Sequence, residues 1–139
     1  MSSGEPTRIS AWLDRDEHDA ARGAYLVAFG AGQADTFSQW ATTAVLSFAQ
    51  LDASERAGIL ERREHGGSPR SGSPRNVVVT PLAVEAMASA MREDREMGQW
   101  QSKSAWFATA LAHATQATQF LSGRPLPTPP ARLPFRRST

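Results

Sequence analysis

The polar residues of this sequence do not have the types and spacing of a known catalytic or metal site. The chain contains no cysteine, which excludes disulfides, thiolate metal sites and a cysteine nucleophile. Its three histidines, His18, His65 and His113, lie far apart and lack metal-ligand spacing. The sequence also shows no glycine-rich phosphate loop and no serine-nucleophile motif. We therefore expect a protein that is not an enzyme and that uses neither a metal nor a cofactor.

A run of polar and aromatic residues occurs twice, 66 positions apart. Residues 38–45 read SQWATTAV and residues 104–111 read SAWFATAL, so both contain Ser-x-Trp-x-x-Thr-Ala followed by an aliphatic residue. An ungapped shift of 66 residues aligns residues 8–50 with residues 74–116, and nine positions are identical. They are Ala20/Ala86, Ala24/Ala90, Gly32/Gly98, Gln33/Gln99, Ser38/Ser104, Trp40/Trp106, Thr43/Thr109, Ala44/Ala110 and Gln50/Gln116. The shared register of the non-alanine matches indicates an internal duplication.

Each copy opens on a segment in which two kinds of side chain alternate. The first segment is RISAWL and the second is NVVVT, and this period of two is typical of a short strand with one buried face. The positions expected to face the core are Ile9, Ala11, Leu13, Val77 and Val79. The positions expected to face outward are Arg8, Ser10, Trp12, Asn76, Val78 and Thr80.

Two helices separated by a glycine-containing turn are predicted after each strand. Asp14 or Asp16 suits the N-cap of the first helix in the first copy, and Thr80 followed by Pro81 suits it in the second. Thr36 and Ser102 suit the N-caps of the second helices. The turns contain Gly32 and Gly98, which are free to take positive φ.

The apolar faces of these helices predict the core. Trp40 and Trp106 each lie in phase on the apolar face of a second helix, so a buried structural role is favoured over a ligand-binding role. The acidic clusters DRDEHD and EDRE are expected at helix ends or on exposed faces, where such residues are solvated.

One copy alone cannot form a stable core, because its single strand would leave backbone groups unpaired. Two copies can pair their strands antiparallel and bury four helices beneath them. The predicted fold class is therefore mostly α with a two-stranded antiparallel ribbon. The first unit spans residues 8–50, a linker with a short helix spans 51–73, the second unit spans 74–122, and a proline- and arginine-rich tail spans 123–139. We expect this tail to be unfolded or polyproline-like by itself.

Charge is distributed unevenly along the chain. The net charge of +1 divides into −5 for residues 1–61 and +6 for residues 62–139, so a polyanion would be attracted mainly to the second part. No apolar run is long enough for a membrane span, and MSSGEPTRIS does not resemble a secretory signal. The sequence therefore predicts a cytoplasmic protein without a membrane segment.

The order of strand, helix, turn and helix resembles the ribbon–helix–helix DNA-binding proteins of the MetJ/Arc class. The resemblance rests on VVVTPLAVEAM, which enters the first helix, and on GQWQSKSAWFATAL, which enters the second. In most members of this family two identical chains supply the two units, whereas this chain carries both. The resemblance therefore implies a tandem, single-chain pseudo-dimer, although exchange of units within a homodimer stays open.

The resemblance also implies which residues contact duplex DNA. The ribbon would enter the major groove, and its outward residues would read base edges. These residues are Arg8, Ser10, Trp12, Asn76, Val78 and Thr80. The start of each second helix would lie against phosphate. Arg75, at the start of the second unit next to the basic linker, would add a further contact. The phosphate-contacting residues are then Thr36, Ser38, Ser102, Lys103, Ser104 and Arg75.

Two classes of function follow from these observations. The first is sequence-specific binding of double-stranded DNA, as a transcriptional repressor or as a plasmid partition (centromere-binding) protein. In that case the tail is a candidate contact for a protein partner. The second is a helical protein-interaction module, or an antitoxin, that acts through its proline-rich tail without DNA.

Overall fold

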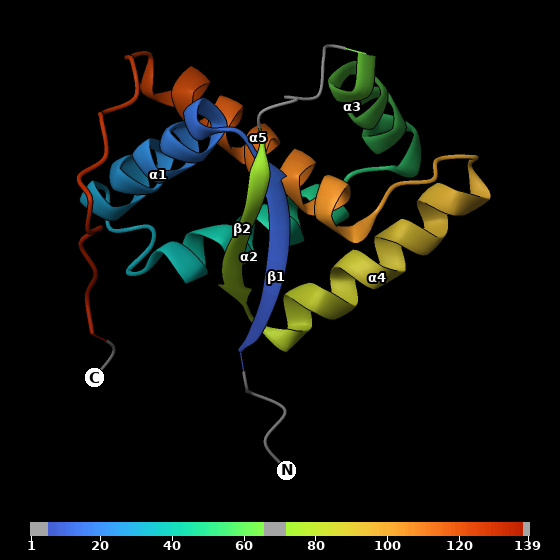
Figure 1. Ribbon diagram of the computed structural model, residues 1–139, viewed down its shortest axis with the longest axis horizontal. Helices are drawn as coiled ribbons and strands as arrows, with labels where there is room; N and C mark the ends of the chain where they lie inside the picture. The colour runs from blue at the N-terminus through green and yellow to red at the C-terminus, as the bar shows by residue number, and fades with distance from the viewer. Residues whose placement is uncertain (1–5, 66–71, 138–139) are drawn as a thin grey trace.

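The chain forms two short strands and five helices in a computed structural model that describes residues 6–65 and 72–137 (Figure 1). In chain order the elements are β1 (Thr7–Leu13), α1 (Arg15–Gly30), α2 (Phe37–Ala49), α3 (Ala53–His65), β2 (Ser73–Val79), α4 (Pro81–Glu96) and α5 (Lys103–Ser122). The protein is thus mostly helical with one two-stranded antiparallel sheet, as the sequence predicts. Within the described residues, no helix is long and apolar enough to span a membrane.

β1 and β2 pair antiparallel along their whole length. Arg8 lies opposite Val78, Ser10 opposite Asn76, and Trp12 opposite Pro74. A two-stranded ribbon is marginal by itself in water, so it needs a hydrophobic surface on which to pack. Figure 1 shows that surface: α2 and α5 pass behind the ribbon, while α1 and α4 lie on opposite sides of it.

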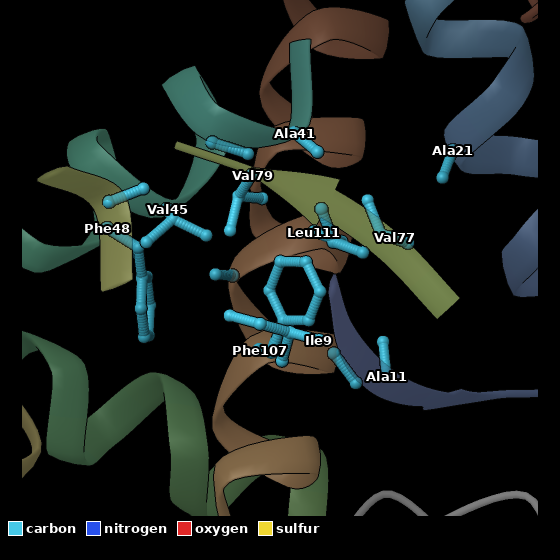
Figure 2. Close-up of a cluster of buried hydrophobic side chains, with 14 of the residues drawn as sticks. Ile9, Ala11, Ala21, Ala41, Val45, Phe48, Val77, Val79, Phe107 and Leu111 are labelled. Atoms are coloured by element: carbon cyan, nitrogen blue, oxygen red, sulfur yellow. The ribbon is translucent and has the colours of Figure 1, made fainter. Parts of the chain in front are cut away.

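The inward face of the ribbon is buried on α2 and α5, and this contact forms the core (Figure 2). The five strand residues predicted to face the core, Ile9, Ala11, Leu13, Val77 and Val79, are all buried. Trp40 and Trp106 are buried as well, which confirms their predicted place in the core. Each large apolar side chain buried in this way stabilises the fold by about 1.5–3 kcal/mol.

The helix starts follow the predicted capping residues. Asp14 caps α1 in a reciprocal capping box with Glu17, which decides between the two aspartates that the sequence offered. Thr36, Thr80 and Ser102 cap α2, α4 and α5 through their side-chain oxygens. The turns after α1 and α4 place Gly32 at φ +74° and Gly98 at φ +88°, where a side chain would be strained.

The corresponding elements of the two units begin 66 residues apart. This spacing holds between β1 and β2, between α1 and α4, and between α2 and α5. α5 is the exception in length, since it has 20 residues against 13 in α2. The two residues at the centre of the ribbon, Ser10 and Asn76, are themselves separated by 66 positions.

Two segments have no counterpart in the other unit. The helix predicted in the linker is α3, and the following residues 66–71 lie outside the described residues. The tail has no helix or strand over residues 124–137, in keeping with the sequence, but it packs along α1 (Figure 1). The sequence did not predict this packing.

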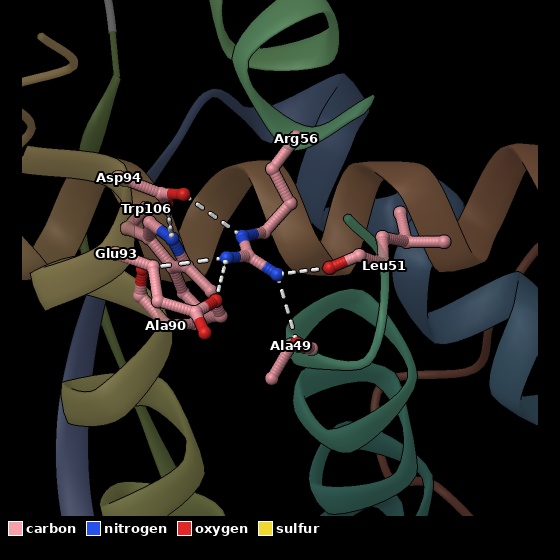
Figure 3. A network of polar contacts seen from close by, with 7 residues as sticks. All are labelled: Ala49, Leu51, Arg56, Ala90, Glu93, Asp94 and Trp106. Carbon is pink, nitrogen blue, oxygen red and sulfur yellow. Dashed lines mark hydrogen bonds and ion pairs between the residues drawn. The ribbon is translucent and has the colours of Figure 1, made fainter. Parts of the chain in front are cut away.

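A buried arginine joins α3 to α2 and α4, and one of its partners bonds α5 in turn (Figure 3). The Arg56 side chain is fully buried, and its guanidinium donates to Asp94 at 3.0 Å and to Glu93 at 2.7 Å. It also donates to the carbonyls of Ala49 and Leu51 at the end of α2, where the helix dipole favours a cation. The Trp106 indole nitrogen donates to the second Asp94 oxygen at 2.9 Å.

This network corrects one sequence-based expectation. The EDRE cluster was expected at a helix end or on an exposed face. It does lie at the end of α4, but its Asp94 is only 1% exposed. A carboxylate is tolerated there because Arg56 and Trp106 satisfy both of its oxygens. Arg56 and Trp106 belong to other helices than Asp94. The periodicity of α4 alone therefore could not reveal the pairing.

Candidate nucleic-acid interface

The outward face of the ribbon carries five of the six residues predicted to read bases. Arg8 and Asn76 are exposed, Ser10 and Val78 are partly exposed, and Trp12 is 42% exposed. The Ser10 hydroxyl donates to Asn76 Oδ1 at 3.1 Å, which holds the two central side chains together. Among the described residues, the Asn76 amide nitrogen keeps both of its donors, and Arg8 offers a guanidinium on the same face of the ribbon. Both groups are suited to the acceptors of purine edges in a major groove.

Thr80 differs from the other predicted base-reading residues. β2 ends at Val79, and Thr80 is the N-cap of α4. Its hydroxyl oxygen accepts from the Ala83 amide, and its own backbone amide donates to Thr42 Oγ1 at 3.3 Å. The structure therefore gives Thr80 a capping role at the end of the ribbon, outside the paired strands.

The start of α5 lies next to the ribbon. Lys103 and Ser104 line a surface depression of about 280 Å³ together with Arg8 and Ser10. Residues predicted to contact phosphate thus meet residues predicted to read bases in one continuous surface. Ser102 caps α5 by accepting from the Ala105 amide. The arrangement combines two cations with hydroxyl groups, which is a suitable set for a phosphodiester backbone.

The start of α2 has a different chemistry. Thr36 caps the helix by accepting from the Gln39 amide, and the Ser38 hydroxyl donates to the Val78 carbonyl at 2.6 Å. Ser38 therefore links α2 to β2, and its hydroxyl proton is not available to donate to a phosphate while this bond is made. In the first unit Phe37 stands where the second unit has Lys103, and Asp35 stands where it has Gln101. The first unit thus contributes an acid here and no cation of its own.

Arg75 is separated from the other predicted phosphate contacts. It is partly buried and lies in phase with Val77 and Val79, on the inward side of β2. Its Nε is buried and has no hydrogen-bond partner among the described residues. Burial lowers the pKa of His18 on α1, and the nearby charge of Arg75 lowers it further. The period of two, extended back from Val77, would have placed Arg75 on this face.

Sequence reasoning did not place the tail near the start of α2. Arg136 of the tail lies beside Asp35, with its Nη1 3.5 Å from a carboxylate oxygen. The only signal in the sequence was complementary charge, an acid in the first unit and a tail with arginines and no acid. Complementary charge cannot place two residues 101 positions apart.

Comparison with known proteins adds no assignment, because no protein-family model, no curated protein and no solved structure matches the chain.

Proposed function

We propose that the protein binds double-stranded DNA and reads the major groove with the β1–β2 ribbon, as a tandem ribbon–helix–helix pseudo-dimer in one chain. The observation that carries this proposal is the ribbon register. Ser10 and Asn76 face each other at its centre and are also equivalent positions of the 66-residue repeat. A local twofold axis through that pair would relate the two units. This is the arrangement in which a β-ribbon presents both strands to a groove.

The outward side chains suggest an asymmetric DNA site. Arg8 suits guanine, Asn76 suits adenine, and Val78 suits a thymine methyl group. Because the two strands differ at every outward position, the two halves of the site should differ in sequence. Such a reader suits direct repeats, which favours an autoregulatory repressor or a plasmid partition protein acting on cytoplasmic DNA.

The rival function is a protein-interaction module that acts through a free tail. The packing of the tail speaks against it, because the tail carbonyls of Pro130, Ala131 and Pro134 already accept hydrogen bonds from α1. A partner would first have to displace these contacts.

The test is selection of bound duplexes from a random double-stranded DNA pool at two salt concentrations. The expected result is a short asymmetric motif whose affinity falls with salt. Asn76→Ala should relax the preference at one position of the motif by about 1–3 kcal/mol. Ser47→Ala, a change at an exposed position on α2, is the matched control and should leave the motif unchanged. A folded protein that enriches no motif would overturn the proposed function.

A further inference from the structure

The tail is held on α1 by specific hydrogen bonds. Arg22 donates to the carbonyls of Pro130 at 2.6 Å and of Ala131 at 3.0 Å. The Tyr25 hydroxyl lies 2.6 Å from the Pro134 carbonyl, and burial raises the pKa of Tyr25, so it remains a neutral donor. Leu126 and Leu133 pack against the core from the tail side. These contacts give the tail one defined path along the first unit.

A glycine in the middle of α1 makes this path possible. A Cβ placed on Gly23 would lie 2.6 Å from the Pro127 carbonyl oxygen, closer than real Cβ contacts allow. Glycine is unfavourable inside a helix by about 1 kcal/mol relative to alanine, so its presence here needs a packing reason. The close approach of the tail backbone is that reason. The equivalent position of the second unit is Ser89, which is exposed.

The end of the tail is fixed beside the start of α2. The Arg136 amide donates to the Asp35 carbonyl at 2.8 Å, and its guanidinium lies 3.9 Å from the centre of the Phe29 ring. The same guanidinium donates to the Phe29 carbonyl at 2.9 Å, yet its side chain remains 45% exposed. Arg137 follows and is exposed. Arg136 and Arg137 therefore lie near the start of α2, where the first unit itself has Asp35 and no cation.

We propose that the docked tail supplies the DNA-backbone contact of the first unit, through Arg136 and Arg137. This inference rests on the proposed DNA-binding function. In the second unit Lys103 lies beside the ribbon and provides the positive charge. In the first unit Asp35 alone would repel phosphate, whereas Arg136 neutralises it and Arg137 makes the local charge positive. The partner is the phosphodiester backbone of duplex DNA next to the sequence that the ribbon reads.

The experiment measures how affinity for the selected duplex depends on salt. The logarithm of the association constant falls with the logarithm of salt by about 0.9 for each neutralised phosphate. The double variant Arg136→Ala/Arg137→Ala should therefore lower the slope by about 1–2. Gly23→Ala keeps every charge but displaces the tail, and it should lower the slope by a similar amount. Arg124→Ala removes one charge where the tail begins and should leave the slope unchanged.

A second measurement shows whether the tail has moved. Trypsin can cleave after Arg132, and this bond should be cut faster in Gly23→Ala than in the unaltered chain because the docked backbone is released. Circular dichroism should show that α1 remains helical, since alanine is the better helix former.

The outcomes separate this inference from the proposed function. If the unaltered chain binds no duplex, the proposed function fails and this inference fails with it. If it binds and both variants keep its salt slope, only the role of the tail is overturned. A third outcome is that the arginine variant lowers the salt slope, whereas Gly23→Ala releases the tail without changing that slope. The arginines would then act without docking of the tail, and the proposed role of docking would be overturned.

Discussion

The two units share their elements but bury different groups at the ends of their helices. In the second unit, the last turn of α4 carries the buried Asp94, which accepts hydrogen bonds from Arg56 of α3 and Trp106 of α5. In the first unit the position equivalent to Asp94 is Ala28, and Trp40 packs on Phe37 with ring centres 5.6 Å apart. Apolar and capping positions are therefore the shared part of the two units. The polar contacts differ because the segments that cover each unit, α3 and the tail, are not repeated.

The largest expected effect breaks the polar network of the second unit. Arg56→Ala leaves Asp94 buried without its cation, and removing one partner of a buried ion pair costs about 3–5 kcal/mol. Arg22→Ala in the first unit removes two bonds to tail carbonyls at a less buried site and should cost less. Urea unfolding of both variants measures the difference. Equal losses would show that Arg56 is no more important than a tail contact.

The second effect compares the two repeated tryptophans. Trp106→Phe removes the indole donor to Asp94 and leaves a buried carboxylate oxygen unsatisfied, which costs about 1–3 kcal/mol beyond the change in packing. Trp40→Phe changes the packing of a buried ring with no such carboxylate, so it is the matched control. Denaturant unfolding should rank Trp106→Phe as the more destabilising of the two. The reverse order would contradict the assigned role of the Asp94 bond.

The third effect tests the cover of the first unit. Tyr25→Phe removes the hydroxyl that lies 2.6 Å from the Pro134 carbonyl and 3.1 Å from the Asp35 carbonyl. The expected cost is about 1 kcal/mol, because a neutral hydrogen bond contributes that much. Tryptic cleavage after Arg132 should also become faster. If stability falls while cleavage is unchanged, the hydroxyl supports the α1–α2 turn rather than the tail.

The sequence allowed the repeated elements to be predicted because each is encoded locally. Alternation gave the inward face of β1, and Thr36 and Ser102 marked helix starts through side chains that bond amides three residues later. Gly32 and Gly98 marked the turns because positive φ favours glycine. Thr80 suited both a strand position and an N-cap, and the structure gives it the N-cap.

The remaining features depend on contacts between distant segments. The pairing of Arg56 with Asp94 joins residues 38 positions apart, and neither helix pattern indicates a buried charge. The tail has no periodicity that predicts where it packs, and its hydrogen bonds to Arg22 and Tyr25 use backbone carbonyls that any residue provides.

The sequence therefore allowed the outward position of the ribbon residues and the start of α5 to be predicted, while their contact with DNA stays a prediction. The place of Arg136 near the start of α2 could not be predicted, because it comes from a segment 101 positions away from Asp35.

The smallest effect concerns a titratable group that only the first unit has at this position. His18 on α1 corresponds to Val84 on α4. Burial first, and the charges of Arg75 and Arg22 next, lower the pKa of His18 from its usual value near 6.5, while Asp19 acts in the opposite direction. The unfolded chain then binds the proton more readily than the folded chain.

The stability contributed by neutral His18 should therefore be complete above about pH 6.5 and should be lost as pH falls towards the lower folded pKa. His18→Val, which installs the residue of the second unit, should remove this part of the pH dependence. Melting temperatures of both chains between about pH 7.5 and 5.5 check it, because most carboxylates remain ionised in that range. The difference between the two curves should change as pH falls. Parallel curves would mean that the pKa of His18 is the same in the folded and unfolded chains, which would contradict this prediction.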